Sequence, residues 1–428
     1  MISFNYETKI LYIIRGGMIM KPMKIAEGIY QLSVNVEDIL FEGLWELPKG
    51  VSLNSYIIRG EKTAIVDGVC GWDGVPETLY ELLDELNIAP ESIEYLIVNH
   101  MEPDHSGWIE SFKKINSNFK VVGSKKAKML LDAFYGQTEN VICVGEGDTL
   151  DLGNGHILNF IDIPNVHWPD TIGTFDTLTG TLFSCDAFGS FGKIIDNKIY
   201  EDELSKEEQK TYEQETIRYF SNVLATFSLQ AKKATAKCSE LPVKLVAPGH
   251  GLLWRNPEKV FKAYSEYSDY SKGPAREEIT LIWGSMYGMT GKAVEHAIKV
   301  LQGEDIIVHV HEVPKDSWGT VLTSVWTSTG IILAMPTYEF KMFPPMATVL
   351  EEMGKKKVHN RKAFRFGSYG WSGGAQKELG EIIAKLNMNW DFIEPVEFLG
   401  MPEDKDLEKV GDGVKEIVKQ VKEMFNNK

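Results

Sequence analysis

Seven side chains of the kinds that bind metals lie in four short motifs, and each motif follows a segment that reads as a β-strand. The motifs are HMEPDH at 100–105, NVHWPD at 165–170, FSCDAFGS at 183–190 and APGHG at 247–251. The candidate ligands are His100, Glu102, Asp104, His105, His167, Asp186 and His250. Two metal ions that each take about three protein ligands and share one would use such a set. The sequence therefore predicts a binuclear metal enzyme.

The spacing of the ligands constrains the fold around them. EYLIVNH is a compact apolar strand that runs directly into His100. Alternate residues of an extended segment point the same way, so His100 and Glu102 can share one metal while His105 turns to the other. A surface loop with scattered polar groups would explain one motif but not four. We expect four strand ends to deliver the ligands to one edge.

Composition limits the partners and the compartment. The net charge of −16 repels phosphate backbones and argues against a nucleic-acid partner. No apolar run approaches the ~20 residues of a membrane span. The four cysteines form no C-x-x-C pair, which excludes a rubredoxin-like or iron–sulfur knuckle within this sequence. They fit reduced thiols, and we expect a cytoplasmic protein.

The pattern changes after YSKGPAREE, a polar segment with Gly273-Pro274 that reads as a linker. Beyond it, five strands alternate with helices near 291–303, 317–328, 344–356, 373–387 and 405–425, which predicts a doubly wound parallel sheet. We predict an N-terminal extension or mis-assigned start at 1–22, a metal domain at 23–272, a linker at 273–278 and a second domain at 279–428.

Three loops of the second domain open at the carboxyl edge of its sheet, where ligands bind in such folds. Backbone N–H groups and hydroxyls of the first loop can cradle a phosphate, and aromatic side chains of the others can wall a flat ring. The absence of G-x-G-x-x-G argues against a nicotinamide dinucleotide. The candidate cofactor-binding residues are Ser285, Met286, Tyr287, Gly288, Met289, Thr290, Pro336, Thr337, Tyr338, Ser368, Tyr369, Gly370, Trp371 and Gly373.

The first region resembles the metallo-β-lactamase fold, an αββα sandwich whose usual signature is His-x-His-x-Asp-His. Here Glu102 replaces the second histidine. Zinc accepts imidazole-rich sites, whereas iron that changes oxidation state favours added carboxylate. The second region looks like flavodoxin, which binds FMN, although many relatives carry Asn where this chain has Met289. Together, over roughly 23–428, the chain resembles the flavodiiron (A-type flavoprotein) family, which includes rubredoxin:oxygen oxidoreductases.

The resemblance implies two irons and one FMN per chain. His100, Glu102 and His167 would hold one iron, Asp104, His105 and His250 the other, and Asp186 would bridge them. In some relatives the histidine that matches His105 is turned away from its iron. No separate acid or base is implied beyond these ligands.

The resemblance also implies reduction of O2 to water, of NO to N2O, or of both, with electrons passed through FMN from an external donor such as rubredoxin. The family forms a head-to-tail homodimer, or a dimer of dimers, that brings the FMN of one chain beside the irons of the other.

Two other classes of protein stay open. A zinc hydrolase fused to a flavodoxin would share the folds, but Glu102 argues against it. A plain electron carrier with a structural metal would not need seven clustered ligands. Metal identity separates the reductase from the hydrolase, and turnover with reduced flavin separates it from the carrier.

Overall fold

The computed structural model describes residues 17–68 and 78–426, and these form two compact units. The first comprises Met1–Phe220 with Leu229–Ser265, and the second Ser221–Ser228 with Glu266–Lys428. Residues 1–16 of the predicted extension, and Cys70, lie outside the described residues. Gly17–Ile19 form strand β1 and pair with β3 (Ile29–Val36). No helix within the described ranges has the length and apolar character to cross a bilayer.

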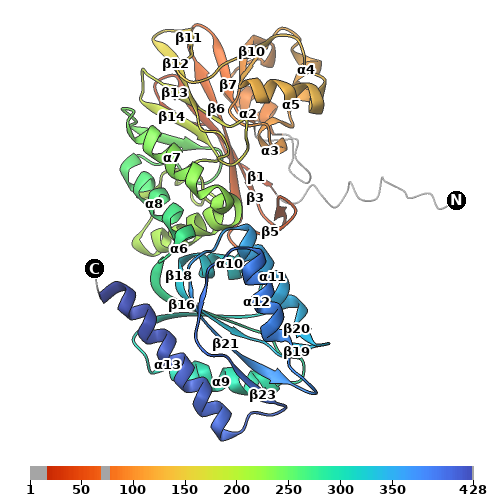
Figure 1. Ribbon diagram of the computed structural model, residues 1–428. Coiled ribbons are helices and arrows are strands. Elements are labelled where there is room, and N and C mark those ends of the chain that lie inside the picture. The colour runs from red at the N-terminus through yellow and green to blue at the C-terminus, as the bar shows by residue number, and fades with distance from the viewer. Residues whose placement is uncertain (1–16, 69–77, 427–428) are drawn as a thin grey trace, which may run out of the picture. The chain divides into compact units, whose positions relative to one another are not determined.

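The first unit is built on two sheets (Figure 1). The first sheet has the order β1-β3-β6-β7-β8-β9-β10, with β2 also on β3. Its other strands are β2 (Met23–Ala26), β6 (Val51–Arg59), β7 (Thr63–Val66), β8 (Ile93–Val98), β9 (Lys120–Gly123) and β10 (Val141–Cys143). Its helices are α2 (Leu79–Glu85), α3 (Pro103–Ser106), α4 (Ile109–Ile115) and α5 (Lys125–Tyr135), and β4 (Leu40–Phe41) pairs with β5 (Trp45–Glu46).

The second sheet follows in the chain, in the order β11-β12-β13-β14-β15. Its strands are β11 (Thr149–Gly153), β12 (His156–Asp162), β13 (Ile172–Asp176), β14 (Thr181–Cys185) and β15 (Leu245–Pro248). Helices α6 (Lys206–Tyr219), α7 (Ser228–Ser239) and α8 (Pro257–Asp269) accompany it. A π-helical turn over Phe220–Leu224 separates α6 from α7.

Apolar residues of both sheets form one core. Ile58, Val66 and Ile97 of the first sheet and Phe160 and Phe183 of the second belong to the same buried cluster. The inner strands are apolar on both faces, as in β8, where five of the six residues are buried. Helices cover the outer faces, with α4 and α5 on one side and α7 and α8 on the other (Figure 1). This is the predicted αββα sandwich.

The second unit holds a parallel sheet in the order β17-β16-β18-β21-β22, with β23 also on β21. Its strands are β16 (Arg276–Trp283), β17 (Ile307–Glu312), β18 (Ser328–Ala334), β21 (Lys362–Tyr369), β22 (Asp391–Phe392) and β23 (Val396–Leu399), and β19 (Thr337–Tyr338) pairs with β20 (Lys341–Met342). Its helices are α9 (Met289–Gln302), α10 (Trp318–Thr327), α11 (Pro344–Lys355), α12 (Ala375–Lys385) and α13 (Asp404–Asn426). The order is that of doubly wound flavodoxin-like sheets, as predicted.

Candidate metal centre

The loop after β8 is fixed at its first residue. The backbone amide of Asn99 donates to Asp67 Oδ1 at 2.8 Å, and its side-chain amide donates to Asp67 Oδ2 at 3.1 Å. Thr174, on the second sheet, donates its hydroxyl proton to Asn99 Oδ1 at 2.6 Å. This network ties the end of β8 to both sheets, so His100 and Glu102 leave the strand from a rigid point.

A single helical turn places the next two candidate ligands. Pro103 opens α3, where its missing N–H costs nothing and its fixed φ suits a helix start. The amides of His105 and Ser106 both donate to the carbonyl of Glu102. Asp104 and His105 are consequently buried side by side within the turn.

The ends of β14 and β15 present Asp186 and His250 together. Cys185 has φ 51°, a left-handed conformation that is strained for a side chain of this size. The strands are parallel here, and the amide of Gly249 donates to the carbonyl of Cys185 at 2.7 Å. The turn at Cys185 directs the next side chain, Asp186, toward the ligand loops of the first sheet.

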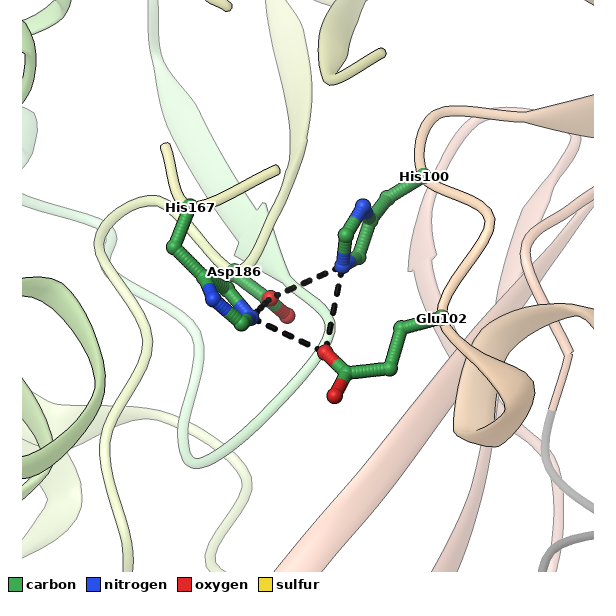
Figure 2. A group of neighbouring side chains, drawn as sticks. All are labelled: His100, Glu102, His167 and Asp186. Carbon is green, nitrogen blue, oxygen red and sulfur yellow. Dashed lines mark hydrogen bonds and ion pairs between the residues drawn. The ribbon is translucent and has the colours of Figure 1, made fainter. Parts of the chain in front are cut away.

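One group of candidate ligands consists of His100, Glu102, His167 and Asp186 (Figure 2). Nε2 of His167 lies 2.9 Å from Glu102 Oε2 and 3.0 Å from Asp186 Oδ2. Nε2 of His100 lies 3.2 Å and 3.5 Å from the same two oxygens. Two imidazole nitrogens and two carboxylate oxygens thus converge on one point. All four side chains are mostly or fully buried.

A second group, Asp104, His105 and His250, meets the other oxygen of the same aspartate. Oδ1 of Asp186 lies 2.9 Å from His105 Nε2 and 3.2 Å from His250 Nε2. Nε2 of His250 is also 3.2 Å from Asp104 Oδ2. Asp186 therefore stands between the two groups with one oxygen toward each, and all seven predicted ligands are brought together.

The buried carboxylates of this cluster require positive charges beside them. Burial lowers the pKa of His100, but the carboxylates of Asp170 and Glu102 outweigh it and raise the pKa to about 10. Burial likewise lowers the pKa of His250, and Asp104 and Asp186 raise it to about 10. Without a metal, protons on the histidines neutralise the carboxylates. Among the residues that the structure describes, no hydrogen-bond partner satisfies either buried Oδ atom of Asp104 or the buried Nε2 of His250. The donor set fits two metal ions, which would satisfy these atoms.

Aromatic rings close the site around His250. The ring of Phe41, on β4, lies edge-on to that of His250 with centroids 5.2 Å apart, and the ring of Tyr219 lies 5.8 Å away. Both rings are fully buried. Apolar walls of this kind lower the local dielectric and strengthen the electrostatic interactions inside.

In the second unit, the three predicted loops line a cavity of about 360 Å³. The lining residues are Ser285, Met286, Tyr287, Met289, Pro336, Thr337, Tyr338, Glu339, Phe340, Ser368, Tyr369, Gly370, Trp371 and Ser372. Gly288, Thr290 and Gly373 of the predicted set are not among them. Gly288 nevertheless opens α9 with φ 86°, and its amide donates to Ser285 Oγ at 3.0 Å. Thr290 Oγ1 and Ser368 Oγ, 2.9 Å apart, join the first loop to the third.

The size and the lining residues of the cavity suit a flavin mononucleotide. Its size falls in the range of small-molecule sites. The first loop leads into the N-terminus of α9, which suits a phosphate, and Tyr338 and Trp371 are exposed rings on the wall. Glu339, Phe340 and Ser372 also line the cavity and were not predicted. Glu339 and Phe340 lie in the turn after β19, where both have positive φ, 46° and 64°.

Two supporting carboxylates near the metal site were also missed. Asp67 ends β7 and carries no local motif that would reveal its contacts. Asp170 closes the same NVHWPD motif as His167 and lies beside His100, so its position in that motif was an available signal.

Comparisons with known proteins agree with both halves of this description. Residues 51–251 match the family described as ODP family beta lactamase. The anaerobic nitric oxide reductase flavorubredoxin of Vibrio vulnificus is 32% identical over 340 residues, 77% of this chain and 66% of the relative. That of Salmonella paratyphi B is 33% identical over 360 residues, 80% of this chain and 72% of the relative.

A solved structure matches along nearly the whole chain. A mutant of the flavo di-iron protein from Thermotoga maritima superposes with a TM-score of 0.83 at 26% identity, and covers 95% of this chain and 99% of that one. The two curated relatives are longer, and the chain spans about two thirds of their length.

Proposed function

The chain belongs to the flavodiiron family, as the resemblance predicted, and from this premise we propose that it is an oxidoreductase that reduces O2 to water, NO to N2O, or both. The fold class is confirmed with the family. The observation that carries the proposal is the position of Asp186, whose Oδ2 faces His100 and His167 while Oδ1 faces His105 and His250. One carboxylate between two ligand groups is the arrangement that a bridged metal pair requires.

The residues present suit iron more than two zincs. We propose that His100, Glu102 and His167 hold one iron, that Asp104, His105 and His250 hold the other, and that Asp186 bridges them. Three carboxylates among seven ligands favour a metal that cycles between oxidation states. When bound, the irons would supply redox equivalents and Lewis-acid binding of the oxidant. His105 is included because its Nε2 points at Asp186.

The protein groups have separate tasks in this reaction. The carboxylates neutralise and position the metals, and Phe41 and Tyr219 keep bulk water away from the His250 side. In the second unit the loop at 285–290 would hold the FMN phosphate, and Tyr338 and Trp371 would contact its ring. FMN would supply the electrons one at a time from a donor that we propose to be rubredoxin-like.

Elemental analysis of protein purified anaerobically from iron-replete cells tests the cofactors. About two irons and one FMN per chain support the proposal, because the candidate ligands form two groups and the three loops of the second unit line one cavity. Anaerobically reduced protein is then mixed with O2 or with NO, and flavin reoxidation is followed at saturating concentrations of each. Two zincs with little iron, together with ester or lactam hydrolysis, would instead indicate the hydrolase.

We also propose that electrons pass between two chains of a head-to-tail homodimer. A hybrid dimer tests this with one chain unable to bind FMN and the other carrying Glu102→Ala and Asp104→Ala. If electrons pass between chains, the hybrid is active, because the FMN of one chain then lies beside the irons of the other. A hybrid as inactive as its two parents contradicts the proposal.

A further inference from the structure

The side of His100 that faces away from the metal position has an acidic neighbour. Its Nε2 points toward Glu102 and Asp186, and Figure 2 shows the other ring nitrogen on the far side. That nitrogen, Nδ1, lies 3.8 Å from Asp170 Oδ1 and 3.5 Å from Thr171 Oγ1. An imidazole that binds a metal through Nε2 carries its remaining proton on Nδ1, and a buried N–H needs an acceptor.

Asp170 is placed to act as the acceptor for the Nδ1–H of His100. Its side chain is buried, and its Oδ2 accepts a hydrogen bond from the amide of Met101 at 2.8 Å. Its Oδ1 has no hydrogen-bond partner within the described part of the chain. A buried carboxylate oxygen without a donor is unfavourable, and the Nδ1 of His100 lies 3.8 Å from this one.

We propose that Asp170 is a positioning residue for His100: once a metal occupies Nε2, Asp170 Oδ1 accepts the Nδ1–H and fixes the ring. The 3.8 Å separation is longer than a hydrogen bond, so the proposal requires the ring and the carboxylate to lie closer together when the metal is bound. This inference rests on the di-iron centre proposed above.

The other metal group has no equivalent support. The Nδ1 atoms of His105 and His250 are buried and lack a hydrogen-bond partner among the residues described. Asp67 comes within 4.8 Å of His105, but its oxygens already accept from Asn99. The supported group that contains His100 is therefore expected to bind its metal first and more tightly than the group that contains His250.

One loop carries both Asp170 and the candidate ligand His167. The segment between β12 and β13 supplies His167 to the metal and Asp170 to the far side of His100. Between them, the ring of Trp168 stands edge-on to that of His100, with centroids 4.9 Å apart and an interplanar angle of 88°. Metal binding at His167 and orientation of His100 are thus coupled through four residues of chain.

Stepwise binding of Fe(II) to the metal-free full-length protein, measured anaerobically against a chromophoric chelator, tests the proposal. The wild type should bind two irons with distinct affinities. Asp170→Asn keeps the size of the side chain and an oxygen for Met101 but removes the charge. We expect it to weaken the tighter step 10- to 100-fold, the usual effect of losing such a partner, and to leave the other step within threefold. His100→Ala, which should abolish the same step, assigns it.

Asp176→Asn is the matched control. Asp176 is also fully buried and pairs with a histidine, His156, at 3.1 Å. Among the described residues its side chain otherwise accepts from Thr179, and neither partner is one of the seven candidate ligands. Its exchange should leave both iron affinities unchanged. Equal losses in the two variants, or an Asp170→Asn protein with wild-type affinities, would overturn the inference. A wild type that binds fewer than two irons would overturn the proposed function first, and this inference with it.

A measurement on the wild type applies even if Asp170→Asn does not fold. In the Zn(II)-loaded, ¹⁵N-histidine-labelled protein, the Nδ1–H of His100 should give a downfield proton signal that exchanges slowly with water at pH 7. Comparison with the spectrum of His100→Gln assigns the signal. A rapidly exchanging or absent signal in the loaded wild type contradicts the hydrogen bond to Asp170.

Discussion

Gly249 lies so close to the ring of His105 that no side chain fits between them. A Cβ added to Gly249 would stand 2.6 Å from Cε1 and 3.3 Å from Nδ1 of His105. Gly249 directly precedes the candidate ligand His250. It therefore limits the space around another candidate ligand, His105, which lies 144 positions earlier in the chain (249 − 105). This contact explains the first glycine of the APGHG motif.

Gly249→Ala should displace His105 and impair the second metal group while sparing the first. We expect about one iron per chain instead of two, and a loss of roughly 1–3 kcal/mol in the free energy of unfolding, as for other overpacked sites. Gly145→Ala is the control, because the nearest atom to its added Cβ, Asp162 Oδ1, is 3.8 Å away. Iron content and denaturant unfolding of both variants check the prediction, and two irons in Gly249→Ala would refute it.

Removing the metals should make stability depend on pH in the alkaline range. In the metal-free site the pKa of His105 and of His167 is about 9, since nearby carboxylates outweigh the opposing effect of burial, and in the unfolded chain histidine titrates near 6.5. The folded state thus holds protons that the unfolded state has released. The stability they contribute is complete below about pH 6.5 and is lost as pH rises through 9.

Thermal unfolding of metal-free and iron-loaded protein at pH 6.5, 8 and 9.5 measures this effect. The midpoint of the metal-free protein should fall with pH by on the order of 5 °C more than that of the loaded protein. The loaded protein is the control for tyrosines, lysines and thiols that titrate in the same range. Parallel curves for the two forms would show that the histidines are not protonated in the empty site.

Trp371→Ala should weaken FMN binding about fivefold, because an exposed aromatic wall contributes on the order of 1 kcal/mol to stacking with a flat ring. The side chain of Trp371 is 83% exposed, and Phe340 supports it with ring centroids 6.1 Å apart. Trp318→Ala removes another exposed tryptophan of the same unit that does not line the cavity. Quenching of flavin fluorescence during titration gives both affinities, and equal values would exclude a role for Trp371.

Asn54→Ala should destabilise the first unit by roughly 2–4 kcal/mol, because it leaves several buried polar groups unpaired. The side-chain amide of Asn54 donates to the carbonyls of Pro248 and Gly251, on either side of His250, and its Oδ1 accepts from Gln31 and Ser33. Asn159→Ala, at a half-buried position on β12, is the control. Denaturant unfolding should separate the two variants, and similar midpoints would contradict the assigned role of Asn54.

The candidate ligands could be located from the sequence because each lies in the loop that follows an apolar strand. His100 after EYLIVN and His250 after VKLVAPG are local signals. The candidate phosphate loop was located in the same way, between β16 and α9. The five helices of the second unit were recognised because apolar residues recur along them at helical spacing.

Other features depend on contacts between distant segments. Asn54 on β6 orients the loop of His250, yet no pattern near Asn54 indicates this. The direction in which the Asp186 side chain points depends on the left-handed conformation of Cys185. Residues other than glycine and asparagine rarely adopt this conformation. The turn that brings Glu339 and Phe340 to the cavity likewise depends on tertiary structure. Such positions follow from the assembled fold and not from local periodicity.

The candidate ligands come from both halves of the αββα sandwich: His100, Glu102, Asp104 and His105 follow the first sheet, and His167, Asp186 and His250 follow the second. A metal bound in either group is therefore a cross-link between the sheets. Neither group is complete until both sheets have formed and docked, because each takes ligands from both. Metal uptake would then mark the last event of maturation, and separation of the sheets would be the event that releases it.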